Sequence, residues 1–333
     1  MRDIGKRLRQ VLEWERVPED EALRDFVARA LDTLDAESPD VRPLDGQSRP
    51  GGLVRLPRGL PAVIVPDIHA RPRFVKAAMD MAFSGPAGGV TALDALSAGD
   101  LCVVFLGDAF HSERRGFERW VDAYREYLAG TVASGAMEAE MTEGLAAMTM
   151  ALELKIAFPD RVHFLKGNHE NVLNEEGRGN HPFGKFVEEG LLTRAWFQDR
   201  YGEETLELYA ALERSLPVCL TGDRFMASHA EPARPYSVRE VVESRSSPEV
   251  VEGLTWTGND QSMEGSVESM LRAFLPGVAG ARYFAGHRAV VGGFALRAGG
   301  LFVQLHDPDA YRVAFVPADR DFDASRDIRS LVP

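Results

Sequence analysis

The chain has 333 residues and a mass of 36.7 kDa, enough for one large domain or two ordinary ones. Apolar residues make up 45% and charged residues 27%, the balance of a soluble protein with a buried core. The 38 basic and 51 acidic side chains give a formal net charge of −13. This charge argues against nucleic acid or anionic lipid as a partner, because unspecific binding to either needs a basic face. A phosphorylated substrate stays open, since a bound metal can reverse the local field.

Cysteine usage and hydropathy narrow the class further. Cys102 and Cys219 both lie in apolar runs, which is typical of buried thiols in a reducing compartment rather than of a disulfide framework or a cysteine-rich zinc site. No apolar stretch approaches the ~20 residues of a membrane span. The charged start MRDIGKRLRQ has no apolar core and is not a secretory signal. We therefore expect a cytoplasmic protein with no membrane partner.

The N-terminal part predicts one amphipathic helix followed by a linker. The apolar positions of the helix recur at helical spacing. Residues 35–58 are rich in Pro, Gly, Ser, Asp and Arg, which is turn and linker composition. We expect residues 1–58 to form a helical extension and linker. The apolar stripe of the helix consists of Leu23, Phe26, Val27, Ala30, Leu31 and Leu34.

From Leu60 onward, short apolar runs end abruptly in polar residues. Each run has the length and composition of a strand that is buried on both faces. Helical stretches at about 117–128 and 137–158 lie between the runs, and this alternation indicates an α/β sheet packed with helices. The runs are PAVIVPDIHA, LCVVFLGDAF, RVHFLKGNHEN, RFMASHAEP and ARYFAGHRAV.

The pattern changes after His287. In VVGGFALRAGGLFVQLHDPDAYRVAFVP, short apolar runs are separated by GG and DPD, which predicts antiparallel strands joined by tight turns. We therefore predict a mixed α/β fold with a parallel part first and a meander last. Its main domain would span residues 59–320, with a tail at 321–333.

Asp, Asn and His side chains stand at the ends of five predicted strands. In α/β sheets such ends gather side chains from distant parts of the sequence. Oxygen and imidazole ligands together favour a first-row transition metal over calcium or a structural zinc. Six side chains suffice for two metals if one carboxylate bridges them. The seven residues at these strand ends are Asp67 and His69, Asp108, Asn168 and His169, His229, and His287.

At this point the sequence resembles the calcineurin-like metallophosphoesterases, and within them the phosphoprotein phosphatases. The family's blocks GDxHG, GDxxDRG, GNHE, HGG and a late GH pair appear here, in order, as PDIHA, GDAFHSERRG, GNHEN, SHAEP and AGHRAV. GLTWTGND and LFVQLHDPDAY also resemble stretches of the phosphoprotein phosphatases, and the similarity covers about residues 61–316. The resemblance implies the calcineurin-like fold, with mixed β-sheets flanked by helices in a four-layer α-β-β-α sandwich.

The resemblance also implies roles for the residues that match its blocks. Asp67 and His69 would bind the first metal, and Asp108 would bridge to the second. His169 would be the catalytic acid that protonates the leaving alcohol. The cofactors would be two divalent transition metals, manganese, iron or zinc, and the nucleophile a metal-bridging hydroxide. The second metal would be completed by Asn168, His229 and His287.

The second block departs from the family where it orients the catalytic histidine and binds phosphate. The family's Asp and Arg are replaced by His111 and Ser112. We expect Glu113 to take over the orienting role. The family's other phosphate-binding arginine is replaced by Gln261. The substrate-binding candidates are therefore Arg114 and Arg115, with Arg288 in reserve.

His306 follows the run LFVQL near the end of the chain. Branches outside the phosphoprotein phosphatases carry an extra ligand histidine two places after the last GH, and Ala289 stands there in this chain. His306 is therefore open as a further ligand. The alternative is that His306 is a turn histidine that lies beside the ligands without binding a metal. His111 and Glu113 would lie beside the ligands in the same way.

Three functions stay open at this point. The first is a phosphatase acting on phosphomonoesters, either a phosphoprotein or a small phosphate ester. The second is a hydrolase of dinucleoside polyphosphates or phosphodiesters with the same metal core. The third is a catalytically silent scaffold, suggested by the altered second block and opposed by the retention of all six ligands and His169.

Overall fold

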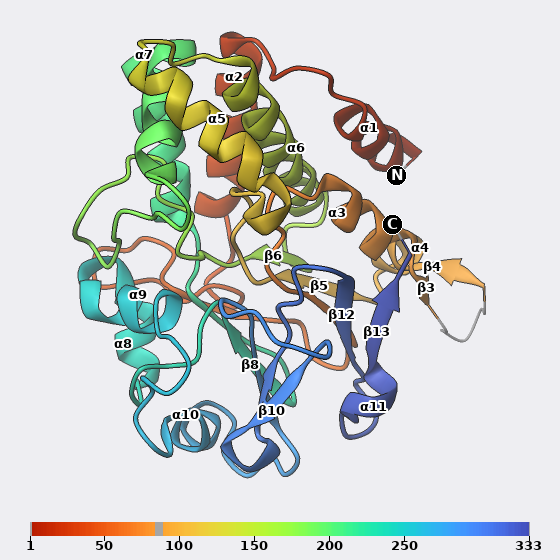
Figure 1. Ribbon diagram of the computed structural model, residues 1–333. Helices are drawn as coiled ribbons and strands as arrows, with labels where there is room; N and C mark the ends of the chain where they lie inside the picture. Colours follow the sequence, from red (N-terminus) through yellow and green to blue (C-terminus); the bar gives the residue numbers. More distant parts are fainter. Residues whose placement is uncertain (1, 84–88, 333) are drawn as a thin grey trace.

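The computed structural model of the chain describes residues 2–83 and 89–332 and contains two large mixed sheets (Figure 1). The first sheet has five strands in the order β13-β12-β2-β5-β6. Strands β2, β5 and β6 are parallel, and β12 is antiparallel to both β2 and β13. Their bounds are β2 Ala62–Val65, β5 Cys102–Phe105, β6 Val162–Phe164, β12 Tyr311–Val316 and β13 Ile328–Leu331.

The second sheet has six strands in the order β1-β7-β8-β9-β11-β10. Strands β8, β9 and β11 are parallel to one another, whereas β10 and β7 run antiparallel to their neighbours β11 and β8. Their bounds are β1 Leu53–Arg55, β7 Cys219–Thr221, β8 Phe225–Ser228, β9 Arg282–Ala285, β10 Ala295–Arg297 and β11 Phe302–Gln304. A separate hairpin pairs β3 (Ala82–Phe83) with β4 (Val90–Thr91).

The two sheets face each other across a shared apolar core. Ile64 and Val104 of the first sheet pack in one cluster with Ala227, Phe284 and Val303 of the second. Because β2 and β5 are covered on both faces, their sequences are apolar at every position. This explains why the predicted strands read as continuous apolar runs.

Helices cover the two outer faces and complete four layers (Figure 1). One group packs on the first sheet, where α6 places buried residues all round its surface. This group comprises α1 Arg2–Leu12, α2 Asp20–Asp35, α3 Pro72–Asp80, α4 Ala92–Ala98, α5 Phe117–Leu128, α6 Gly135–Ala157 and α7 Glu189–Ser215.

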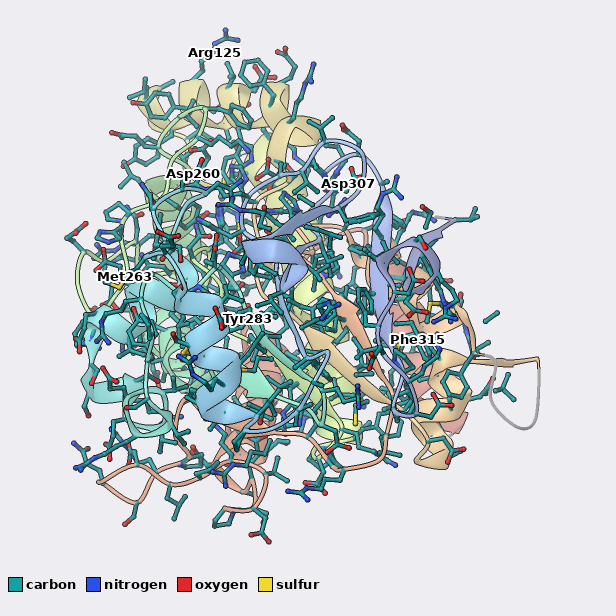
Figure 2. The ribbon with its side chains drawn as sticks, turned by 90° about the horizontal axis from the view of Figure 1, so that it is seen from below. Arg125, Asp260, Met263, Tyr283, Asp307 and Phe315 are labelled. Carbon is teal, nitrogen blue, oxygen red and sulfur yellow. The ribbon has the colours of Figure 1, made fainter. Side chains whose placement is uncertain are left out.

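The smaller helices cover the second sheet. Tyr283 of β9 is fully buried in a cluster with Met270 and Leu271 of α10, and Figure 2 shows it beside that helix. This group comprises α8 Val238–Val242, α9 Pro248–Thr255 and α10 Ser266–Phe274, while the short α11 (Ala324–Asp327) precedes β13. None of the described helices is long and apolar enough to cross a membrane.

The predicted elements recur with small shifts, and one prediction needs correction. Helix α5 has the predicted bounds, and α6 begins two residues before and ends one residue before its prediction. The C-terminal strands do not form one meander. Strand β11 pairs with β9 and β10 in the second sheet, whereas β12 crosses to the first. The loop of residues 305–310 therefore spans from one sheet to the other, and nothing in the local pattern indicates that change.

Residues 2–58 contribute to both the helical layer and a sheet. Leu23 and Val27 of α2 lie in the same core cluster as Tyr209 of α7, and β1 forms the edge of the six-stranded sheet. Helix α1, which the sequence pattern did not indicate, packs in this cluster through Ile4 and Leu8. The division into extension, catalytic domain and tail stays a prediction.

Candidate metal centre

Three parallel strands of each sheet place the polar residues at one site between the two sheets. Strands β2, β5 and β6 of the first sheet end just before Asp67 and His69, Asp108, and Asn168 and His169. Strands β8, β9 and β11 of the second sheet end just before His229, His287 and His306. Because parallel strands bring their carboxyl ends to the same edge, both sets of side chains gather there.

One group of ligand atoms surrounds the side chain of Asn168. Its Oδ1 lies 2.9 Å from Nε2 of His229 and 2.9 Å from Nδ1 of His287. The same Nε2 of His229 lies 3.4 Å from Oδ2 of Asp108. These are the four residues expected to hold the second metal.

The other group surrounds the side chain of His69. Its Nε2 lies 3.7 Å from Oδ2 of Asp67 and 3.8 Å from Oδ2 of Asp108. Asp108 therefore faces both groups through one oxygen, as a bridging carboxylate would. Nδ1 of His306 lies 3.7 Å from Oδ2 of Asp67, on the same side as His69.

These distances fit metal ligation. Two ligands bonded to one ion at ~2.0–2.1 Å can stand no more than about 4.2 Å apart. Every pair above meets this bound. Nδ1 of His69 donates to the carbonyl of Phe110 over 3.2 Å, and Nδ1 of His229 donates to that of Leu106 over 2.9 Å. Such bonds fix the tautomer that leaves Nε2 free for a metal.

The electrostatics of the pocket also favour a cation. Burial opposes ionisation of Asp67, but the imidazoles of His306 and His229 outweigh it and lower the pKa of Asp67 below its ordinary range. Burial likewise opposes a charge on His229, yet the carboxylates of Asp108 and Asp67 raise its pKa to about 9. The two buried carboxylates thus draw a positive charge into the space between them, and a divalent metal supplies one.

His169 lies beside the ligands in an aromatic setting. Its Nε2 is 3.8 Å from Oδ2 of Asp108, and its ring stacks on His111 with centroids 5.0 Å apart. Nδ1 is buried, and none of the described residues accepts or donates a hydrogen bond there. Burial lowers the pKa of His169 to about 3, although the Asp108 carboxylate opposes that shift. A substrate phosphate nearby would favour the protonated form.

Glu113 points into the centre but not toward His169. Its Oε1 lies 3.4 Å from Nε2 of His69, and its other oxygen pairs with Lys185. Its backbone is left-handed, with φ of 56°, and its N–H donates to Nδ1 of His111 over 3.3 Å. The structure thus places Glu113 next to the first group of ligands, whereas the role expected for it was at His169.

The three candidate arginines lie at the rim. Arg115 donates to the carbonyl of Ala70 and to Glu143, each over 2.8 Å, so its side chain lies along the loop after β2. Arg114 is exposed on the short 3-10 turn of residues 113–116, and Arg288 is exposed next to His287. None of the three is directed among the ligand atoms by a contact in the described structure.

Two buried residues hold the ligand loops and were not singled out from the sequence. The carboxylate of Glu170 accepts the N–H groups of Asp108 and Ala109, each over 2.9 Å, and that of Gly167 over 2.6 Å. Its signal was present as the last letter of GNHE. Arg71 donates to the carbonyl of Asp67 over 2.9 Å, and no sequence pattern indicated it.

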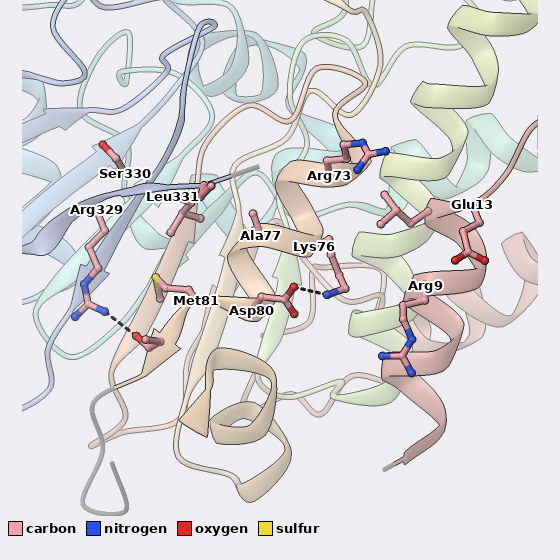
Figure 3. Close-up of a pocket in the computed structure, with 13 residues that line it drawn as sticks. Arg9, Glu13, Arg73, Lys76, Ala77, Asp80, Met81, Arg329, Ser330 and Leu331 are labelled. Atoms are coloured by element: carbon pink, nitrogen blue, oxygen red, sulfur yellow. Dashed lines mark hydrogen bonds and ion pairs between the residues drawn. The ribbon is translucent and has the colours of Figure 1, made fainter. Parts of the chain in front are cut away.

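A large cavity elsewhere does not include the ligands. It measures about 780 Å³ and lies between α1, α3 and β13 (Figure 3). Its lining contains no histidine, and of its two carboxylates Asp80 pairs with Lys76. The residues predicted from the sequence to carry the chemistry therefore lie at the strand ends and not in this cavity.

Comparisons with known proteins agree with this arrangement at the level of the fold. No protein-family model and no curated protein matches the sequence. The chain is similar to a protein serine/threonine phosphatase from Saccharomyces cerevisiae with similarity to human phosphatase PP5. The TM-score is 0.58 at 13% identity, over 95% of this chain and 90% of that one.

Two further solved structures match over a smaller share of the chain. A putative diadenosine tetraphosphatase has a TM-score of 0.44 and 15% identity over 84% of this chain and 97% of its own. The cold-active protein-tyrosine phosphatase of a psychrophilic Shewanella species has a TM-score of 0.46 and 13% identity, over 84% and 82%. The yeast phosphatase, matched over nearly the whole chain, confirms the predicted fold class. The chain has the calcineurin-like metallophosphoesterase fold that the resemblance to phosphoprotein phosphatases implied.

Proposed function

We propose that the chain is a metal-dependent phosphatase that hydrolyses a phosphomonoester, either of a phosphoprotein or of a small molecule. The observation that carries this proposal is the convergence of six ligand side chains from both sheets, with Asp108 between the two groups. A silent scaffold would have no use for this arrangement, because buried carboxylates and imidazoles are costly unless something satisfies them.

The ligand set suits two divalent transition metals. Asp67, His69 and Asp108 would hold the first, and the second would be held by Asp108 with Asn168, His229 and His287. Mixed oxygen and nitrogen donors suit manganese, iron or zinc. When bound, two such ions supply Lewis acidity that polarises a phosphate ester and lowers the pKa of water toward neutrality.

The remaining chemistry falls to the chain's own side chains. His169, next to Asp108, would hand a proton to the leaving alcohol at its Nε2. Arg114, Arg115 and Arg288 are the groups from which a phosphate oxygen would receive a charged hydrogen bond at the rim. Phe183, whose ring centroid lies 4.6 Å from that of His169, would help to exclude water from the donated proton.

A phosphodiester or dinucleoside polyphosphate is the second candidate substrate, and for a diester the position of Glu113 favours it. The carboxylate lies next to His69, and Ser112 stands where the family has an arginine. A phosphomonoester dianion meets more repulsion from this carboxylate than a diester monoanion does. Rates on p-nitrophenyl phosphate, its bis-ester and diadenosine tetraphosphate, measured with manganese added, decide between the two.

Metal content tests the function itself. The purified chain should bind close to two manganese ions, because two groups of ligand atoms are present. Asp108→Asn should weaken both, since it faces both groups, whereas His287→Ala should mainly weaken one. The same substitution at half-buried His181, His181→Ala, is the matched control and should leave binding unchanged. A wild-type chain that takes up no manganese, zinc or iron, and shows no thermal shift with them, would refute the assignment.

A further inference from the structure

We propose that His306 is a fourth protein ligand of the first metal, binding through Nδ1 beside Asp67 and His69. This rests on the proposed metal centre. His306 follows strand β11, and none of the five sequence blocks includes that strand.

The position of the Nδ1 atom carries the inference. It lies 3.7 Å from Oδ2 of Asp67, the same distance that separates this oxygen from Nε2 of His69. One ligand atom from each of the three residues can be chosen so that all lie within 4.8 Å of one another. The imidazole rings of His69 and His306 have centroids 5.0 Å apart and planes inclined at 58°, so they are not stacked in parallel. Both rings can therefore direct a nitrogen at one point beside Asp67.

The burial of His306 gives an independent reason. Its side chain is 2% exposed, and Nδ1 has no hydrogen-bond partner among the described residues. At 3.7 Å, Asp67 is too far to accept a hydrogen bond from it. Leaving a buried polar nitrogen without a partner is energetically unfavourable. A metal between the two atoms removes this cost, because both become its ligands.

The backbone around His306 is tied to the backbone around Asp67 by one buried guanidinium. Arg71 donates to the carbonyls of Asp67 and Ile68 over 2.9 and 2.8 Å. From its other side it donates to the carbonyls of Asp307 and Pro308 over 3.3 and 3.2 Å. Figure 2 labels Asp307 in the loop that follows β11. The loop that carries His306 is thus held in register with the loop that carries Asp67 and His69.

With His306 included, each of the two metal sites would have four protein ligands. The first metal would have Asp67, His69, Asp108 and His306, and the second Asp108, Asn168, His229 and His287. Without His306, the first site has three protein ligands and should bind its metal more weakly than the second. The affinity of the first metal, not only the activity, therefore reports on His306.

Two substitutions at His306 separate ligation from packing. Nδ1 of histidine and Oδ1 of aspartate are both bonded to Cγ, so His306→Asp keeps a ligand atom at this place. His306→Leu has a similar shape and removes the ligand. We expect His306→Leu to bind one manganese with near wild-type affinity and the other at least ~100-fold more weakly, since even outer partners of ligands are worth ~10–100-fold. His306→Asp should recover most of that loss.

The measurements are manganese titration by calorimetry and the absorption spectrum of the cobalt-loaded chain. The spectrum should change in His306→Leu, because a nitrogen ligand is lost, and stay unchanged in the surface control His181→Leu. Circular dichroism checks that each variant is folded, and His306→Ala, which also removes the ligand, replaces the leucine variant if that one does not fold. Two manganese ions bound with wild-type affinity by a folded His306→Leu chain, or no gain from aspartate over leucine, would overturn the proposal. A wild-type chain that binds no metal would instead overturn the proposed function.

Discussion

Asp108 faces both groups of ligand atoms, and its backbone is left-handed, with φ of 52°. Such a conformation costs a non-glycine residue about 1–2 kcal/mol and persists only where the surroundings enforce it. Glu170 does so by accepting the N–H groups of Asp108, Ala109 and Gly167 with its two carboxylate oxygens. The last residue of GNHE would therefore act on bound metals through Asp108.

Glu170→Gln tests this role. The amide group would turn an N–H donor toward backbone N–H groups, so at least one buried donor would lose its acceptor. We expect the free energy of unfolding to fall by about 1–3 kcal/mol and manganese affinity to fall ~10–100-fold. Urea unfolding and manganese titration measure the two effects. Glu176→Gln, at an exposed position, is the control, and equal behaviour of the two variants would show that Glu170 does not position Asp108.

The contribution of His169 to kcat should depend on how strongly the leaving group needs a proton. As a general acid it should contribute ~10²–10⁴-fold to kcat for alkyl phosphates, whose alcohols leave poorly without a proton. With p-nitrophenyl phosphate, His169→Gln should lose far less, because that leaving group scarcely needs protonation. Metal content should stay at the wild-type value, which separates this role from ligation. A loss of the same size on both substrates would assign His169 another task.

At the scale of elements, the turn after β5 decides whether the two ligand loops fit together. Gly107 has φ of 111°, and a Cβ built on it would lie 2.6 Å from the backbone nitrogen of Gly167. A side chain there would push apart the segments that carry Asp108 and Asn168. The glycine is required both by its backbone conformation and by this close approach.

Gly130 offers a matched comparison for that turn. Its φ of 92° is also left-handed, but nothing lies within 4 Å of a Cβ built on it. Gly130→Ala should therefore lose only the conformational cost of about 1–2 kcal/mol, whereas Gly107→Ala should lose about 1–3 kcal/mol more through the clash. Gly107→Ala should also bind manganese more weakly. Equal losses of unfolding free energy in the two variants would rule out the close approach as the cause.

At the scale of the whole molecule, a buried polar network joins the N-terminal segment to the helical layer. Glu37 accepts from Lys155 of α6 over 2.5 Å and from Arg42 over 2.8 Å. Arg42 is completely buried and also donates to the carbonyl of Ser215, at the end of α7, over 2.6 Å. Nδ1 of His163, in β6, lies 3.2 Å from Nζ of Lys155. Burial and the Lys155 ammonium lower the pKa of His163 to about 4.

This network makes stability depend on pH. In the unfolded chain His163 has a pKa of about 6.5, so between about pH 6.5 and pH 4 the unfolded state binds a proton that the folded state does not. The stabilisation is therefore complete above about pH 6.5 and is lost as the pH falls toward 4, by up to about 3 kcal/mol.

Urea unfolding of wild type and His163→Gln across this range isolates the contribution. The difference in unfolding free energy between the two should shrink as the pH falls, since only wild type carries the titrating ring. A difference that stays constant from about pH 7 to about pH 4.5 would show that His163 is not kept neutral by the fold.

What could be predicted from the sequence is what local chemistry dictates. Apolar runs ending in Asp67, Asp108, Asn168, His229 and His287 predicted the strands and their polar ends, because a strand covered on both faces must be apolar until it leaves the core. The order of the five blocks added the fold, which the structure confirms, and the pairing of these residues with two metals, which stays a proposal. Helix α5 was predicted as a helical stretch between two strands, and its bounds agree with that prediction.

Only the tertiary structure decided which distant groups meet. That β11 and β12 enter different sheets, that Glu113 turns to His69 rather than to His169, and that Arg71 ties two loops together all depend on contacts between distant segments. His306 shows the limit most clearly, because its sequence neighbours are compatible with either a turn or a ligand. Its partner Asp67 is 239 positions away in the sequence, and only the packing of one sheet on the other brings their side chains to 3.7 Å.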